Sequence, residues 1–89
     1  MKKTGEIVIK NEFGLHARPA AALVSLTSKF KSQIFLIKDD TKVNAKSILG
    51  VLVLAAESGS TVQVEAEGED ADEAITQIQE LAENHFGTE

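Results

Sequence analysis

Residues 61–86, TVQVEAEGEDADEAITQIQELAENHF, contain two different hydrophobic periods side by side. Thr61–Glu67 alternates apolar and polar residues, which is typical of a strand with one face in water. After Gly68 the apolar residues recur at helical spacing, which predicts a helix that starts behind a cap at Asp70 and ends at Gly87. Its apolar stripe consists of Ala71, Ala74, Ile75, Ile78, Leu81, Ala82 and Phe86. A strand followed directly by an amphipathic helix indicates a mixed domain of strands and helices.

The chain before this stretch continues the mixture. The predicted elements are a strand at Ile7–Ile9, a helix at Ala17–Phe30, a hairpin of Ile34–Ile37 with Lys42–Asn44 around the turn Asp39-Asp40, and a short helix at Ile48–Leu54. Pro19 fits the first turn of its helix, where a missing N–H costs nothing. The resulting order, β-α-β-β-α-β-α, favours helices packed on one face of an antiparallel sheet.

Length and composition exclude several classes of protein. Eighty-nine residues are enough for one domain, residues 1–89, and not for a second core. The net charge of −5 argues against nucleic-acid binding, and the lack of cysteine excludes disulfides, thiolate metal sites and cysteine nucleophiles. The first residues lack the apolar stretch of a signal peptide, and the longest apolar run is too short to span a bilayer. We expect a cytoplasmic monomer without membrane insertion.

The first candidate site is Gly14–Ala20, GLHARPA. His16 lies where a loop meets the start of a predicted helix, beside the chain's one arginine, Arg18, and its one proline. The free N–H groups and positive dipole end of a helix favour an anion there, and a guanidinium adds paired donors. A histidine in this position is suited to carrying a phosphoryl group. The other histidine, His85, falls in the last turn of the final helix, where we expect a structural role.

The second candidate site is Lys46–Gly50, KSILG. Ser47 is a suitable N-cap for the short helix that follows it. Val51, Leu54 and Ala55 of that helix can face the core together, which leaves its other large apolar residues partly exposed. These exposed residues are Ile48, Leu49 and Leu52. An apolar patch of this kind favours partner docking, and a phosphate on Ser47 would place a new charge beside it.

Together, Gly14–Ala20 and Lys46–Gly50 resemble the HPr family, the histidine-containing phosphocarriers of the bacterial phosphoenolpyruvate-dependent sugar phosphotransferase system. The first motif resembles that family's active-site signature, and the second resembles its regulatory serine region. The resemblance covers essentially the whole chain, and the two motifs at this separation are highly specific. It implies an α+β fold, an open-faced β-sandwich in which a four-stranded antiparallel sheet is covered on one face by three helices.

The resemblance also implies roles for individual residues. His16 would accept a phosphoryl group on Nδ1 from Enzyme I and pass it to an EIIA domain, while the Arg18 side chain and the backbone N–H groups of Ala17 and Arg18 steady the phosphate. Ser47 would be the target of an HPr kinase/phosphorylase, and its modification would weaken transfer through His16. Docking of partners is expected on Leu15, Ala21, Ile48, Leu49 and Leu52. The chain would then be a phosphoryl carrier, not an enzyme, and would need no cofactor and no metal.

Three other interpretations stay open. Val53–Gly59 is similar to the nitrogen-related paralogue of the family, which uses the same histidine chemistry for regulation, and the first predicted helix carries little positive charge. A small acylphosphatase-type enzyme would use Arg18 as a phosphate cradle and an asparagine to orient water, and Asn11 is the one asparagine near that loop. A ligand-sensing regulatory dimer has a similar element order, but the sequence supplies no polar ligand pocket for it.

Overall fold

The computed structural model describes residues 1–88. Its elements are β1 (Lys2–Val8), α1 (Ala17–Thr27), β2 (Gln33–Lys38), β3 (Thr41–Asn44), α2 (Ile48–Leu54), β4 (Thr61–Glu67), α3 (Ala71–Glu83) and a short 3₁₀ turn, η1 (His85–Gly87). This order confirms the β-α-β-β-α-β-α arrangement predicted from the sequence. The predicted hairpin is β2 with β3, and its turn is at Asp39 and Asp40.

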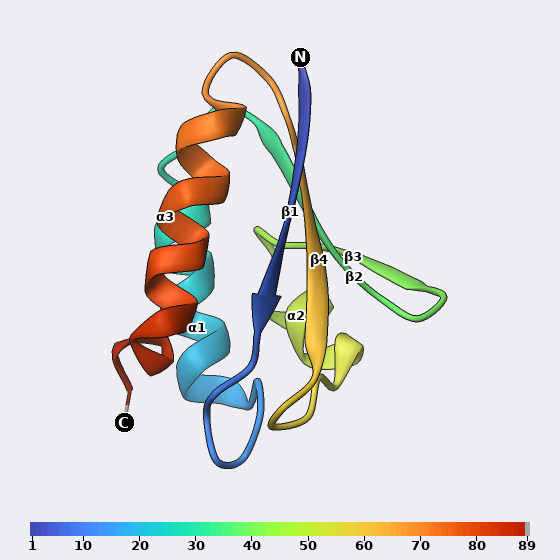
Figure 1. Cartoon of the computed structure of the whole chain (residues 1–89), viewed down its shortest axis with the longest axis vertical. Helices are drawn as coiled ribbons and strands as arrows, with labels where there is room; N and C mark the ends of the chain where they lie inside the picture. Colours follow the sequence, from blue (N-terminus) through green and yellow to red (C-terminus); the bar gives the residue numbers. More distant parts are fainter. Residues whose placement is uncertain (89) are drawn as a thin grey trace.

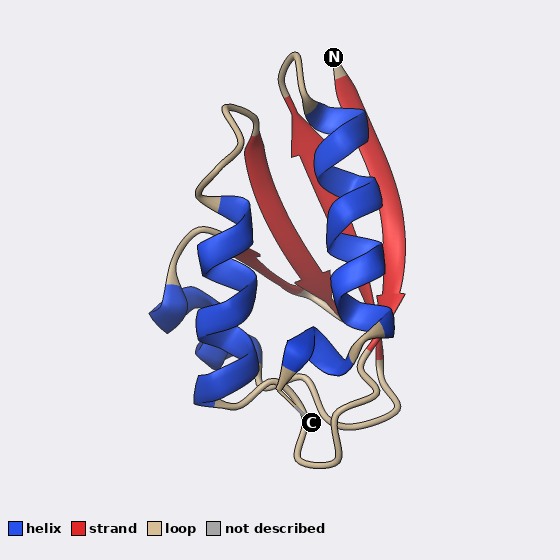
Figure 2. Ribbon diagram, turned by 90° about the vertical axis from the view of Figure 1, so that its left-hand side faces the viewer, coloured by secondary structure: helices blue, strands red, loops and turns tan. Residues whose placement is uncertain are grey.

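The four strands form one antiparallel sheet in the spatial order β1-β4-β2-β3. The long helices α1 and α3 lie over one face of this sheet (Figure 1 and Figure 2), and α2 packs against α1 and β3. The core lies between the helices and the sheet. The predicted α+β class, with four antiparallel strands and three helices, is therefore confirmed. No helix within residues 1–88 combines the length and the apolar character needed to cross a membrane.

The central strand β4 has the alternation that the sequence predicts. Val62, Val64 and Ala66 are fully buried, while the residues between them are exposed or half-buried. At the edge of the sheet, β1 begins earlier than the predicted strand Ile7–Ile9, because its pairing with β4 starts at Lys2, and it ends one residue sooner, at Val8. The first five residues of β1 carry little apolar character, so backbone pairing with β4 extends this strand where the hydrophobic pattern gives no signal.

The first helix ends earlier than predicted. α1 stops at Thr27, not at Phe30, because the Lys29 N–H bonds to the Leu26 carbonyl only three residues back and tightens the last turn. The Thr27 hydroxyl is fully buried and donates a hydrogen bond of 2.8 Å to the carbonyl of Ala45. Phe30 lies beyond the helix and still packs into the core.

The last helix also ends earlier than predicted. α3 stops at Glu83, and Phe86 lies beyond it in η1, not on the helix itself. His85 and Phe86 both have left-handed backbone conformations, with φ of 55° and 54°, which an α-helix excludes. Gly87 therefore ends the 3₁₀ turn and not α3. The Phe86 side chain is nonetheless only 1% exposed, so the turn serves to bring it into the core.

The predicted helix cap at Asp70 is wrong in its contacts. Asp70 does precede α3, but its carboxylate makes no side-chain cap bond to that helix. It accepts hydrogen bonds from the Ser32 hydroxyl at 2.5 Å, and from the backbone N–H groups of Lys31 and Ser32, each at 2.9 Å. The hydroxyl of Ser32, followed by the N–H of Lys31, lowers the pKa of Asp70 from 3.8 to about 2. Asp70 therefore joins the start of α3 to the segment before β2.

The short helix α2 has the predicted bounds, Ile48–Leu54, and one of the three residues expected to face the core does not. Val51 and Leu54 are buried as expected. Ala55, predicted to face the core with them, is exposed, because it adopts a left-handed conformation (φ 52°) that ends the helix. The chain reverses there, and Ala56 is buried instead, with 3% of its surface exposed.

Candidate functional site

His16 occupies the N-cap position of α1, with an extended backbone (φ −82°, ψ −168°). Its carbonyl accepts the first hydrogen bond of the helix, from the N–H of Ala20 at 3.0 Å. Its imidazole makes no cap hydrogen bond, and the residue is exposed. Ala17 and Arg18 are exposed in the first turn, where N–H groups have no carbonyl four residues earlier in the helix. The structure thus brings the predicted acceptor and the predicted phosphate donors together at one helix end.

The loop that carries His16 is fixed to the segment that follows α2. The N–H of Leu15 donates a 2.9 Å hydrogen bond to the carbonyl of Ala56. Gly14 has a φ of +74°, and a side chain at this position would meet the same carbonyl and come within 3.2 Å of the Cα of Glu57. Gly14 therefore permits both the turn and the close approach. The position of His16 depends on this contact between two loops that lie far apart in the sequence.

The other side of the loop is held by Asn11, which is completely buried. Its Nδ2 donates hydrogen bonds of 2.9 Å to the carbonyl of His85 and 3.0 Å to the hydroxyl of Thr88. Its own carbonyl accepts from the N–H of Gly14 at 3.0 Å and closes a turn. The Nδ2 group of Asn11 is thus engaged inside the protein, and its Oδ1 is buried there without a hydrogen-bond partner among the described residues, so neither atom lies on the loop's exposed face. This arrangement does not support the acylphosphatase-type interpretation, in which this amide would orient a water molecule.

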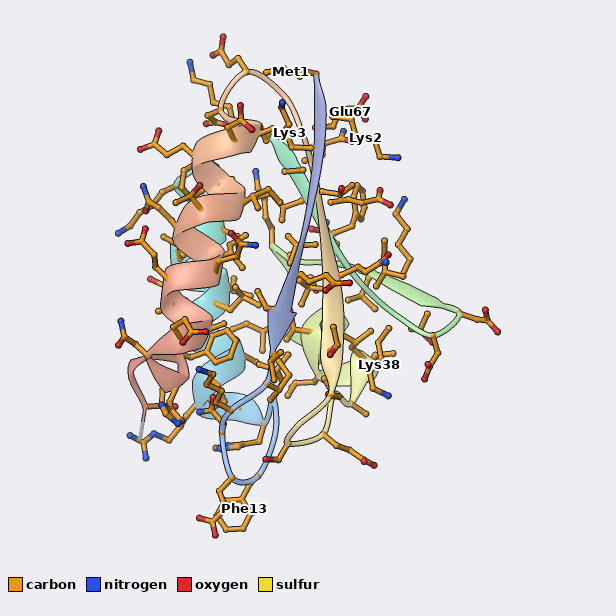
Figure 3. The ribbon with its side chains drawn as sticks, viewed as in Figure 1. Met1, Lys2, Lys3, Phe13, Lys38 and Glu67 are labelled. Atoms are coloured by element: carbon orange, nitrogen blue, oxygen red, sulfur yellow. The ribbon has the colours of Figure 1, made fainter. Side chains whose placement is uncertain are left out.

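Phe13 is a site residue that the sequence reasoning missed. It lies in the turn closed by Asn11 and Gly14, and 76% of its surface is exposed. Its ring meets the imidazole of His16 edge to face, with ring centroids 6.4 Å apart and planes at 72°. Figure 3 shows Phe13 at the far end of the loop, pointing away from the body of the molecule. The available signal was an aromatic residue in the loop expected before the first helix, three positions before the candidate acceptor.

Ser47 forms the predicted N-cap of α2. Its hydroxyl oxygen accepts a hydrogen bond of 3.1 Å from the N–H of Gly50. The segment before it is fixed by the amide oxygen of Asn44, which accepts from the N–H of Lys46 at 2.8 Å, and by the Lys46 ammonium, which donates to the carbonyl of Phe30 at 2.7 Å. Ser47 is half-buried.

The five residues predicted for docking do not all lie on the surface. Leu15 is only 4% exposed and packs in the core, so it has too little surface for docking. The other four are exposed or half-buried, and these are Ala21, Ile48, Leu49 and Leu52. Two further apolar residues, which were not predicted for docking, are also exposed: Phe13 in the His16 loop and Val53 in α2. The two segments are linked by the hydrogen bond between the His16 loop and Ala56.

Comparison with known proteins decides the family. A family model described as the PTS HPr component phosphorylation site matches residues 3–84. The chain belongs to the HPr family. HPr of Xylella fastidiosa (strain 9a5c), a phosphocarrier protein, is 46% identical over 81 residues, which cover 91% of each chain. The HPr-like protein Crh of Bacillus subtilis is 44% identical over 73 residues, 82% of this chain and 86% of the relative.

Solved structures of HPr proteins share the fold. HPr-C-His from Thermoanaerobacter tengcongensis matches with a TM-score of 0.92 and 52% identity over 98% of both chains. HPr of Bacillus anthracis matches with a TM-score of 0.84 and 38% identity, over 89% of this chain and 94% of that chain. HPr is the phosphocarrier of the phosphotransferase system and a phosphoryl carrier rather than a catalytic enzyme, and family membership implies Enzyme I and EIIA domains as partners. The enzyme and ligand-sensing interpretations lose their basis.

Proposed function

We propose that this chain carries the phosphoryl group on His16, which receives it from phospho-Enzyme I and gives it to EIIA domains in sugar uptake. The observation that carries the proposal is the exposed imidazole at the N-cap of α1, unbonded to the helix that it precedes. Transfer forms a P–N bond to His16 and breaks the bond to the donor, and the reverse occurs at the next partner. The proposal takes residues 1–89 as one HPr-like domain acting in the cytoplasm as a monomer.

Phosphate stabilisation is assigned to Arg18 and to the backbone N–H groups of Ala17 and Arg18. Within residues 1–88 no ion pair engages the Arg18 guanidinium, so it is free to meet a phosphate on the neighbouring imidazole. Pro19, which is next in the helix, has no N–H, and Ala20 already donates to His16. Two N–H groups and one guanidinium are moderate donors, which suits a group that must be held briefly and then released.

We further propose that Ser47 is a site of regulatory phosphorylation by an HPr kinase/phosphorylase. This proposal is supported by the position of Ser47, which is half-buried at the N-cap of α2, and by the exposed apolar side chains beside it. These are Ile48 and Leu49, at 42% and 76% exposure. A dianion at this point would place charge beside an apolar docking surface and weaken the approach of partners. Docking is assigned to Ala21, Ile48, Leu49 and Leu52.

The test is intact-mass spectrometry after incubation with phosphoenolpyruvate and a catalytic amount of the cognate Enzyme I. The chain has only two histidines, so His85→Asn is a matched control for His16→Ala, and asparagine tolerates the left-handed backbone at position 85. We expect one acid-labile phosphate on the parent and on His85→Asn, and none on His16→Ala. A phosphate that persists in His16→Ala, or is lost in His85→Asn, would overturn the assignment of the acceptor.

A further inference from the structure

The turn that carries Phe13 is anchored on both sides. Asn11 before it is completely buried and bonded through its side chain to the C-terminal turn. Gly14 after it closes the turn by donating to the Asn11 carbonyl at 3.0 Å, and Leu15 is buried and bonded to Ala56. The backbone at Phe13 is therefore held in place, although the side chain itself projects into water.

The Phe13 side chain contributes little to the free energy of folding, because 76% of its surface stays in contact with solvent. A single exposed apolar residue is common and needs no explanation by itself. The contact with His16 is the informative observation. The ring centroids are 6.4 Å apart and the planes meet at 72°, which is within the range of favourable edge-to-face aromatic pairs.

We propose that Phe13 is a positioning residue for phosphoryl transfer: its ring restricts rotation of the His16 imidazole and presents the reacting nitrogen to the donor. This inference rests on the proposed function of His16. An exposed side chain changes rotamer within picoseconds to nanoseconds, and most of its orientations do not point a ring nitrogen at the donor. Transfer requires close and aligned reacting atoms, so a neighbour that narrows the range of orientations raises the rate of the chemical step.

The size of the effect is limited by the strength of the contact. One solvent-exposed aromatic pair changes a conformational population by a small factor, so its removal should slow transfer about threefold to tenfold. The melting temperature should not change, because little of the Phe13 surface is buried. A small effect is also what a carrier requires, since a rigidly trapped imidazole would hinder its second transfer.

The experiment compares the parent with Phe13→Leu and Phe13→Tyr in single-turnover rapid-quench assays over a range of phospho-Enzyme I concentrations. Leucine keeps an apolar side chain for docking but lacks the ring, and tyrosine keeps the ring. We expect Phe13→Leu to lower the limiting rate constant with little change in the half-saturating concentration. Phe13→Tyr should transfer the phosphoryl group at the parent rate. NMR contacts between the rings at positions 13 and 16 should be present in the parent and in Phe13→Tyr, without any Enzyme I.

Different results would refute the positioning role of Phe13 and the proposed function of His16. A Phe13→Leu variant with the parent's limiting rate, or one affected only in its half-saturating concentration, would refute positioning and leave Phe13 as an ordinary docking contact. Absence of ring-to-ring NMR contacts in the parent would refute it as well. A parent chain that takes no phosphate would refute the proposed function, and the inference would fall with it.

Discussion

Replacement of Gly14 by alanine tests how the His16 loop is held. Gly14 has a φ of +74°, and a Cβ there would meet the Ala56 carbonyl and lie 3.2 Å from the Cα of Glu57. The left-handed backbone costs alanine about 1–2 kcal/mol, partly offset by about 0.5 kcal/mol of lost freedom in the unfolded chain. Overpacking against backbone atoms adds roughly 1–3 kcal/mol. We therefore expect Gly14→Ala to lower the free energy of unfolding by about 2–4 kcal/mol.

Gly59→Ala is the matched control for this experiment. Gly59 also has a left-handed φ, +86°, but a Cβ there would have no atom within 4 Å. It carries the same backbone cost without the overpacking, so we expect a loss of only about 1 kcal/mol. Urea denaturation measures both variants, and rapid-quench phosphorylation should show slower transfer for Gly14→Ala alone, because only Gly14 lies in the His16 loop. Equal stability losses, or a parent-like transfer rate for Gly14→Ala, would refute the claim that the Ala56 contact positions His16.

Substitutions at three further positions test the supporting structure and the role of Ser47. Asp70→Asn should be less stable than the parent at neutral pH, and the difference in stability should shrink as pH falls from 3.8 to about 2, because the lowered pKa of Asp70 contributes stability only while its carboxylate is ionised. Thermal melts from pH 2 to 6 measure this difference, with the exposed Asp72→Asn as control. A difference that stays constant over this pH range would contradict the prediction. Thr27→Val should cost about 1–3 kcal/mol in urea, since it leaves the Ala45 carbonyl without its buried donor, whereas the exposed Thr76→Val should cost under about 0.5 kcal/mol. Ser47→Ala should lose about 1 kcal/mol with the N-cap. Ser47→Asp should keep the cap and still slow phosphorylation of His16, and an unchanged rate would remove the regulatory role of charge there.

The sequence was most informative where a local pattern determined the structure. The alternation in Thr61–Glu67 predicted β4 with the bounds that the structure shows, and Ser47 was identified as a cap because serine is a preferred residue at the N-cap position. GLHARPA placed His16 at a helix start, since a proline in the first turn fixes where that helix begins. These features depend on neighbours within a few residues along the chain.

Features that depend on distant contacts were beyond sequence reasoning. Asp70 has the residue type of a cap, but its partners come from a segment 38 residues away, and no local pattern reveals them. Leu15 seemed available for docking because it precedes His16, yet it packs in the core of the folded chain. The role of Phe13 depends on a turn that is held by hydrogen bonds at Asn11 and beyond Gly14. These bonds join segments that are far apart in the sequence, so they can be recognised only in the folded chain.

The most direct test of the central claim is a chase of labelled phosphate through the chain. The protein is phosphorylated by Enzyme I with labelled phosphoenolpyruvate, separated from it, and mixed with a cognate EIIA domain. If His16 is the site of a carrier, the label should leave the chain and appear on EIIA in equal amount, and His16→Ala should carry none at any stage. Label that stays on the chain, or that appears as inorganic phosphate without reaching EIIA, would contradict the account.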